Sequence, residues 1–294
     1  MFDFRLKVFR TVARRLNFTK AAQELYITQP AVTKHIKEIE KHFEVKLFDR
    51  NGTRIKLTEA GAVLLKHTEQ VFELHRKAEI ELNNLKNLQA GSLRIGASTT
   101  IANYIIPLVL PGFKKAYPDI KVTLKIDNTE RVEQMLLNKE IDLGITEGYT
   151  KSSALEYDEF LEDEIVLVTA SREFGEHITK AALKSIPLLL REHGSGTLDV
   201  INHALGEKEL KTNVYKITMR LSSTESIKLY LLNSECAAFL SIYSVLNELK
   251  HNTFRVIDIE KVFMQRYFYW VKLQGEHNSL VDLFMKHASS YNYR

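Results

Sequence analysis

The chain has 294 residues, of which 45% are hydrophobic, with 41 Lys or Arg against 37 Asp or Glu. This length and composition suffice for two or three domains with hydrophobic cores. The single cysteine excludes an internal disulfide and a cysteine-based metal cage. Asp3, Arg5 and Lys7 interrupt the N-terminus, and no apolar run approaches the ~20 residues of a membrane span. We therefore expect a soluble, cytoplasmic protein without a secretory signal.

Positive charge is concentrated near the N-terminus. Residues 1–58 carry 13 Lys or Arg against 6 Asp or Glu, a net charge of +7, whereas the remaining residues carry 28 against 31, a net charge of −3. A local positive potential attracts a polyanion such as DNA. By itself, the excess could also arise by chance in a segment of this length.

Three short helices are predicted before residue 44. Each has an apolar stripe with steps of three to four residues: Phe2, Leu6, Phe9, Val12 and Ala13; then Phe18, Ala21, Ala22 and Leu25; then Val32, Ile36, Ile39 and Phe43. Asn17 is a typical N-cap for the second helix, and Thr28 for the third. Pro30 lies in the first turn of the third helix, where its missing N–H costs nothing. A break over residues 26–28 separates these two helices.

The outer face of the third helix carries groups that suit base edges and phosphates. Gln can bond adenine with two hydrogen bonds, Ala and Thr methyls can pack on a thymine methyl, and Lys can reach guanine or phosphate. The predicted DNA-reading residues are Thr28, Gln29, Pro30, Ala31, Thr33, Lys34, His35 and Lys37. Taken alone, the same face is equally typical of an ordinary solvated helix.

A hairpin is predicted after the third helix. Residues 46–50 and 53–57 read as strands on either side of Asn51-Gly52, a dipeptide preferred in two-residue hairpins because both positions tolerate positive φ. Arg50, Arg54 and Lys56 would lie on or beside this hairpin, where we expect them to bind backbone phosphates. Break and hairpin together indicate a winged helix-turn-helix domain over residues 1–58.

A long helix is predicted next, capped by Thr58 and continuing to about Leu88. Along this helix, a set of mostly apolar residues recurs on average every 3.5 residues and forms one seam. A 3.5-residue period keeps such a seam facing a partner helix. The residues of the seam are Ala60, Leu64, His67, Val71, Leu74, Ala78, Glu81, Leu85 and Leu88. Thirty residues would span ~45 Å. We expect a dimerising linker helix and hinge over residues 59–90; a helix packed inside its own domain is the alternative.

Strand-like and helical segments alternate from residue 91 onward, which indicates α/β lobes around mostly parallel sheets. The expected strands are 93–97, 122–126, 141–145, 165–170, 186–190, 215–221, 237–241, 254–257 and 267–273, with helices through 110–117, 131–137 and 198–205. In such sheets a ligand binds beyond the C-terminal strand ends, where helix N-termini present free N–H groups.

Three loops fit that rule, and each offers hydroxyl groups. The predicted effector-binding residues are Ser98, Thr99 and Thr100 after the first strand, Thr129 after the second, and Gly194, Ser195, Gly196 and Thr197 before the helix at 198. Hydroxyls and backbone N–H groups at helix N-termini describe an anion site. The alternative is that these Ser and Thr residues are only N-caps.

The chain resembles the LysR-type transcriptional regulators. The resemblance rests on Asn17-Phe18-Thr19-Lys20-Ala21-Ala22, Thr28-Gln29-Pro30-Ala31-Val32-Thr33, Leu47-Phe48-Asp49-Arg50 and Leu57-Thr58-Glu59-Ala60-Gly61, which follow one another at the family's spacing. It implies a bacterial or archaeal regulator that binds an interrupted palindrome in promoter DNA as a homodimer or tetramer. It also implies a small-molecule co-inducer, with RNA polymerase as a further candidate partner.

The resemblance also implies the architecture of the C-terminal part. The effector-binding domain, residues 91–294, would look like a type 2 periplasmic binding protein, with lobe I at 91–161 and 267–294 and lobe II at 162–266. The three hydroxyl-bearing loops would then face one another across a cleft. Residues 191–197 are similar to the corresponding turn in LysR-type regulators of sulfur metabolism, which hints at a small inorganic or carboxylate anion.

Other chemistry is not supported by the sequence. The ten histidines show no metal-ligand spacing, no cofactor motif is present, and Gly194-Ser195-Gly196 is not a nucleophile elbow, so we expect no enzyme. Cys236 is expected to be a small buried residue. Two alternatives stay open: a small-molecule-binding or enzyme-derived α/β domain with a DNA-binding appendage, and a chromatin protein without sequence preference.

Overall fold

The computed structural model describes residues 3–51, 54–85, 90–149, 151–206, 210 and 214–293. The chain divides into two compact units, Met1–Lys86 and Asn87–Arg294, each of which is described by itself. Within the described residues, none of the helices combines the length and apolarity that crossing a bilayer requires.

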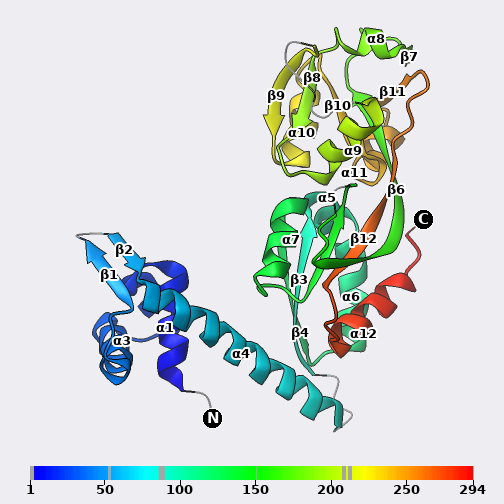
Figure 1. Ribbon diagram of the computed structural model, residues 1–294. Helices are drawn as coiled ribbons and strands as arrows, with labels where there is room; N and C mark the ends of the chain where they lie inside the picture. The colour runs from blue at the N-terminus through cyan, green and yellow to red at the C-terminus, as the bar shows by residue number, and fades with distance from the viewer. Residues whose placement is uncertain are drawn as a thin grey trace. The chain divides into compact units, whose positions relative to one another are not determined.

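The first unit contains three helices, a two-stranded hairpin and a long helix (Figure 1). In chain order these are α1 (Phe4–Arg15), α2 (Phe18–Leu25), α3 (Gln29–Phe43), β1 (Phe48–Asn51), β2 (Arg54–Leu57) and α4 (Glu59–Leu85). Their shared core includes Phe9, Ala21, Ile36 and Phe48, with Phe48 stacking against Phe9 and Phe18 at ring-centre distances of 5.7 Å.

Helix ends in this unit follow the expected caps. The Asn17 side chain accepts a hydrogen bond of 2.9 Å from the Lys20 N–H, and Thr28 Oγ1 accepts one of 3.4 Å from the Ala31 N–H. Between them, Tyr26 adopts a left-handed conformation with φ of 55°, which ends α2 and lets the chain turn into α3. The break over residues 26–28 is therefore confirmed.

Some expected core positions differ in the structure. Phe43 is 52% exposed because α3 ends there, at a left-handed C-cap on Glu44. Leu6 and Leu25 are only half-buried, and Phe2 lies outside the described residues. Val8, which the sequence reading omitted, is fully buried on α1.

The hairpin is shifted by one residue from its expected position. Asn51 is the last residue of β1 and pairs with Arg54 in β2, so it belongs to the ladder and not to the connection. The connecting residues 52 and 53, which include Gly52 of the predicted turn, lie outside the described part of the chain.

The start of α4 packs closely on Leu47, just before β1. Thr58 caps α4, because its Oγ1 accepts a hydrogen bond of 3.0 Å from the Gly61 N–H. A Cβ atom at Gly61 would lie 2.2 Å from the Leu47 carbonyl oxygen, so only glycine fits there. Farther along the expected seam, Val71 and Leu74 are exposed, and residues 86–89 lie outside the described part.

The second unit is built on a long mixed sheet with the strand order β4-β3-β5-β12-β6-β10-β8-β9. The strands of its first half are β3 (Gly91–Ser98), β4 (Ile120–Asp127), β5 (Leu143–Glu147), β6 (Leu155–Thr169) and β12 (Gln265–Leu273). Those of its second half are β7 (His177–Ile178), β8 (Leu188–Arg191), β9 (Ile217–Leu221), β10 (Ala237–Ser241) and β11 (Arg255–Ile259).

Helices cover both halves of this sheet. Those of the first half are α5 (Thr99–Tyr104), α6 (Ile106–Ala116), α7 (Thr129–Leu137) and α12 (Ser279–Ser289). Those of the second half are α8 (Lys180–Leu183), α9 (Gly196–Leu205), α10 (Thr224–Leu231) and α11 (Ile242–Lys250). The second half has hydrophobic clusters on two sides of its strands, one around Leu188 and Phe239 and the other around Val168 and Leu240.

The expectation of mostly parallel sheets needs a correction, because two central strands run the other way. β12 is antiparallel to β5 and β6, and β6 is antiparallel to β10 and β11. These two strands carry the chain from one half to the other and back, as Figure 1 shows, so their direction is set by the crossover. The β3–β4, β3–β5, β8–β9 and β8–β10 pairs are parallel, as expected.

Candidate DNA interface and effector site

The open face of α3 presents most of the predicted reading residues. Thr28, Gln29, Pro30, Lys34 and Lys37 are exposed, whereas Ala31 and Thr33 are half-buried. An open groove runs along this face and is lined by Gln29, Pro30, Thr33, Lys34, Lys37, Glu38 and Lys41. Five of the eight predicted reading residues therefore line one open groove on the first unit.

His35 departs from the expected surface. It is half-buried, its ring meets the Phe4 ring edge-on at 5.6 Å, and its Nδ1 lies 3.5 Å from Glu38 Oε2. Position 35 is close to one helical turn from buried Val32 and Ile39, so its side chain lies at the edge of the inner stripe. His35 is thus placed to pack against α1 more than to read bases.

Basic residues on α1 and on α3 differ in their ion pairing. On α1, Arg14 pairs with Glu69 at 2.9 Å and Arg15 with Glu24 at 2.6 Å, so these charges are neutralised within the chain. On α3, no carboxylate in the described part of the chain forms an ion pair with Lys34 or Lys37. Positive charge is therefore available on the same helix face that carries the polar reading groups.

Local contacts orient part of this face. Gln29 Nε2 donates a hydrogen bond of 3.0 Å to Thr33 Oγ1, one turn farther along α3. Lys41 and Glu38, which also line the groove, and Tyr26, which is 95% exposed at the preceding turn, were missed by the sequence reading. Lys41 continues the spacing of Lys34 and Lys37, and that spacing could have identified it.

The hairpin places three basic residues on two adjacent strands. Arg50 is paired with Ile55 across the ladder, Lys56 with Asp49, and Arg54 with Asn51. Lys56 is exposed. The side chains of Arg50 and Arg54 lie outside the described part of the structure.

In the second unit, a cavity of about 280 Å³ lies where the two halves meet. Its described lining residues are Thr129, Glu130, Glu133, Glu147, His193, Gly194, Ser195, Gly196, Leu198, Asp199 and Asn202. Two of the three predicted hydroxyl-bearing loops are therefore brought together, since Thr129 starts α7 and residues 194–196 precede or start α9.

Hydrogen bonds join these two loops. The Glu130 N–H donates to the Gly194 carbonyl oxygen at 3.2 Å, and Asn128 Nδ2 donates to the His193 carbonyl oxygen at 3.3 Å. Close approach depends on glycine, because a Cβ atom at Gly196 would lie 2.1 Å from the Glu147 carbonyl oxygen and 2.6 Å from Thr129 Oγ1. Gly194 has a φ of +80°, which side chains rarely adopt.

The third predicted loop does not line this cavity. Ser98 and Thr100 are buried at the start of α5, and Ser98 Oγ and Thr99 Oγ1 have no hydrogen-bond partner. Thr197, the last of the predicted residues, also points elsewhere, since its Oγ1 accepts a hydrogen bond of 3.0 Å from Arg266 Nη1. Ser98, Thr100 and Thr197 are buried in the protein interior and do not line the cavity. The position of a hydroxyl in a loop sequence does not show whether its side chain faces a cavity.

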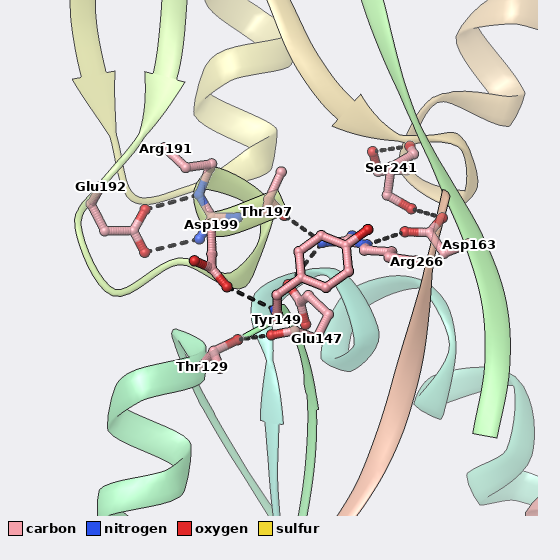
Figure 2. A network of polar contacts seen from close by, with 11 residues as sticks. Thr129, Glu147, Tyr149, Asp163, Arg191, Glu192, Thr197, Asp199, Ser241 and Arg266 are labelled. Carbon is pink, nitrogen blue, oxygen red and sulfur yellow. Dashed lines mark hydrogen bonds and ion pairs between the residues drawn. The ribbon is translucent and has the colours of Figure 1, made fainter. Parts of the chain in front are cut away.

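A buried polar network adjoins the cavity (Figure 2). Arg266 Nε donates to Asp163 Oδ2 at 2.7 Å, and Arg266 Nη1 lies 3.6 Å from Glu147 Oε1. Asp163 also accepts a hydrogen bond of 2.7 Å from Ser241 Oγ. The network joins β5, β6, β10 and β12, so it connects both halves of the sheet to the cavity through Glu147.

Carboxylates give the cavity its electrostatic character. Burial raises the pKa of Glu133; a hydrogen bond from the Tyr157 hydroxyl, at 2.7 Å, opposes that rise, and the neighbouring charges of Asp199 and Glu130 add to it. Asp199 Oδ2 accepts a hydrogen bond of 2.7 Å from the Tyr149 N–H. Glu133, Asp199 and Arg266 were all missed by the sequence reading, because isolated charged residues in helices and strands carry no local signal.

In the part of the chain that the structure describes, no group of three or more His, Cys, Asp or Glu residues is arranged to hold a metal ion. Cys236 is buried, and its Sγ lies 3.8 Å from Thr218 Oγ1, which agrees with the expected small core residue.

Two protein-family models match the chain. Residues 4–62 match the bacterial regulatory helix-turn-helix protein of the lysR family, and residues 86–291 match the LysR substrate binding domain. Together these matches span both units.

Individual proteins give the same result. A probable RuBisCO transcriptional regulator of Phaeodactylum tricornutum is 33% identical over 267 residues, which cover 89% of this chain and 87% of the relative. The crystal structure of full-length CbnR complexed with its target DNA has a TM-score of 0.69 at 18% identity, covering 98% of this chain and 99% of that one.

The regulatory domain of Synechocystis PCC6803 CcmR, solved in complex with 2-PG, resembles the second unit. It is 26% identical, has a TM-score of 0.60, and covers 68% of this chain and 96% of its own. With the helix-turn-helix of the first unit and the two-part α/β second unit, these likenesses show that the chain belongs to the LysR family of transcriptional regulators.

Proposed function

We propose that this LysR-type regulator reads an interrupted palindrome in promoter DNA through α3, in pairs. The observation that carries the proposal is the open face of α3, where Gln29, Lys34 and Lys37 are exposed and both lysines lack an internal ion-pair partner within the described residues. Gln29, Ala31 and Thr33 would contact base edges, whereas Thr28, Pro30 and the lysines would position the helix. His35 would support the helix from the side of Phe4.

Arg50, Arg54 and Lys56 would bind backbone phosphates from the hairpin. Their place on two adjacent strands supports this role, since a two-stranded ribbon can track the DNA backbone beside the reading helix. We assign DNA binding to residues 1–58.

Residues 59–90 would form the dimerising linker. Support comes from α4, whose 27 residues carry exposed Val71 and Leu74 along one seam. One reading helix specifies few base pairs, so a homodimer or a tetramer would supply the remaining half-sites. RNA polymerase is a further proposed partner at the promoter, and the cytoplasm is the proposed compartment because bacterial DNA lies there.

The second unit would sense a small effector in the cavity lined by Thr129, Gly194, Ser195 and Gly196. We divide residues 91–294 into lobe I, 91–161 and 267–294, and lobe II, 162–266. The division is supported by β6, whose ladder partner changes from β12 to β10 and β11 after residue 164. Four of the predicted effector residues do not line the cavity and would support its walls without contacting the effector: Ser98, Thr99, Thr100 and Thr197.

The cavity is proposed to bind its ligand without transforming it. Ser195 Oγ has no hydrogen-bond partner, so neither His193 nor any other described base activates it as a nucleophile. Effector binding would act by closing the lobes and changing how dimers pack, which requires unequal affinity for the two assemblies.

Footprinting of the DNA upstream of the protein's own gene tests the proposal. We expect protection of two half-sites related by two-fold symmetry, and a weaker preference for these half-sites in a Gln29→Ala variant that still binds DNA. Uniform protection without a preferred site would exclude a sequence-specific regulator and favour a protein that coats DNA.

A further inference from the structure

Four carboxylates line the effector cavity: those of Glu130, Glu133, Glu147 and Asp199. The one titratable base among the described lining residues is His193. This charge balance is opposite to the one that an anion requires, although the loops carry the hydroxyls and helix N-termini that suggested an anion.

Both helix N-termini at the cavity already have a negative charge beside them. Glu130 lies in the first turn of α7, and Asp199 lies in the first turn of α9. A carboxylate in the first turn interacts favourably with the helix dipole. The positive ends of these two helices are therefore offset before any ligand enters.

The charges of buried arginines near the cavity are also paired, although Arg266 Nη2 makes no hydrogen bond. Arg266 lies 2.7 Å from Asp163 and 3.6 Å from Glu147, and Arg191 pairs with Glu192 at 2.9 Å. An entering anion would meet neither a free guanidinium nor a lysine among the described lining residues.

Two buried lining atoms lack a hydrogen-bond partner. Ser195 and Glu147 are each 3% exposed, and neither Ser195 Oγ nor Glu147 Oε2 makes a hydrogen bond. A carboxylate oxygen only accepts hydrogen bonds, so Glu147 Oε2 requires a donor. Leaving such an acceptor unsatisfied in a buried site is unfavourable, and a ligand N–H group would satisfy it.

Glu133 is under repulsion from neighbouring carboxylates as well as desolvation. The raised pKa of Glu133 reflects first its burial and then, against the Tyr157 hydrogen bond, the charges of Asp199 and Glu130. A bound positive charge would relieve that repulsion. Because the described carboxylates are not arranged as a metal site, an organic cation fits better than a metal ion.

We infer that the effector of this regulator carries a positively charged nitrogen group, an ammonium or guanidinium, held by the carboxylates of Glu130, Glu133, Glu147 and Asp199. The inference rests on the proposed function, in which this cavity is the effector site. It names the chemical class that the cavity selects and reverses the charge suggested by the loops alone.

Thermal-shift and calorimetric titrations of the full-length protein test this inference. The cationic probes are putrescine, agmatine and L-arginine, and the anionic probes are glycolate, succinate and sulfate, all at equal ionic strength so that screening is constant. We expect at least one cationic probe to raise Tm, because a ligand that binds only the folded state stabilises it.

The matched variants are Glu133→Gln and Asp199→Asn, which remove one charge each and keep an oxygen to accept the hydrogen bonds from Tyr157 and Tyr149. We expect about tenfold weaker binding of the cation in each. Glu235→Gln, at an exposed carboxylate that does not line the cavity, removes the same charge and should leave binding unchanged.

Several outcomes overturn the inference. Equal cation binding by wild type, Glu133→Gln and Asp199→Asn would show binding elsewhere, and the absence of any cation effect would contradict the charge assignment. Anion binding that strengthens in these variants and is lost in Thr129→Val would overturn the charge while keeping the cavity as effector site. DNA footprinting judges the DNA-reading part of the proposed function independently.

Discussion

Arg266 and Asp163 form a buried ion pair, with Nε and Oδ2 2.7 Å apart, and stand opposite each other in β12 and β6. Both side chains are almost fully inaccessible to water. The pair lies where β6 changes its ladder partner from β12 to β10, and Ser241 of β10 also bonds Asp163. It therefore holds the junction of the two halves in one arrangement.

Asp163→Asn should strongly destabilise the second unit, because it leaves the buried Arg266 charge without its closest partner. Removing one member of a buried pair costs about 3–5 kcal/mol. Asp158→Asn is a matched control on the same strand, since Asp158 pairs with Lys272 at 3.0 Å but is 44% exposed. The control should cost at most about 1 kcal/mol. Urea unfolding measures both, and equal losses would contradict the assignment.

Glu133→Gln should remove the loss of folding stability that ionisation of Glu133 causes at neutral pH. The folded-state pKa of Glu133 is raised from its ordinary 4.5, so its contribution to stability is present below that value and is lost as pH rises through the folded-state pKa. The variant should therefore melt at a higher temperature than wild type near pH 7, with the difference shrinking toward pH 4. Tm measured across this range checks the sign; a gap that widens on acidification would refute it.

Gly196→Ala should push the two loops of the cavity apart. The added methyl would lie 2.1 Å from the Glu147 carbonyl oxygen, which is backbone and cannot rotate away. We expect loss of effector response, together with a lower Tm, while DNA binding by the first unit persists. Gly175→Ala is the control, because its nearest heavy atom is 3.5 Å away. Effector titrations followed by DNA-binding assays distinguish the two variants.

Gln29→Ala and Arg54→Ala should affect DNA binding in different ways. Gln29 lies on the open face of α3, so its loss should cost about 1–3 kcal/mol of discrimination at one base pair and leave the salt dependence unchanged. Arg54, on the hairpin, should weaken binding to all sequences and lower the salt slope by about one unit. Competition assays at several salt concentrations measure both effects; an Arg54 variant with an unchanged slope would contradict phosphate binding.

The sequence predicted the helix-turn-helix well because its signals are local. Asn17 and Thr28 cap their helices through their own side chains, and the short interval between them leaves little freedom to the chain. The hairpin was predicted but placed one residue too early. The Asn51-Gly52 dipeptide favours a turn at these two residues, whereas Asn51 pairs with Arg54 as the last residue of β1. Backbone pairing across two strands prevailed over the preference of the dipeptide.

Less of the effector site could be predicted, because it depends on contacts between distant segments. Thr129 and residues 194–196 were identified from hydroxyls at helix starts, but Glu133 and Asp199 join them only through the fold. The first half of β6 and the helices α10, α11 and α12 were not recognised either. The charged alternation of residues 156–164 hides a strand whose stability comes from pairing with β12.

The continuity of β6 limits how this regulator can be recombined with its relatives. One strand of 15 residues supplies a ladder partner to β12 with its first part and to β10 and β11 with its last. Exchanging a single lobe would therefore cut a shared strand and expose two sheet edges. Hybrid proteins should instead be joined near residue 90, so that the whole second unit is transferred to the DNA-binding domain of another regulator.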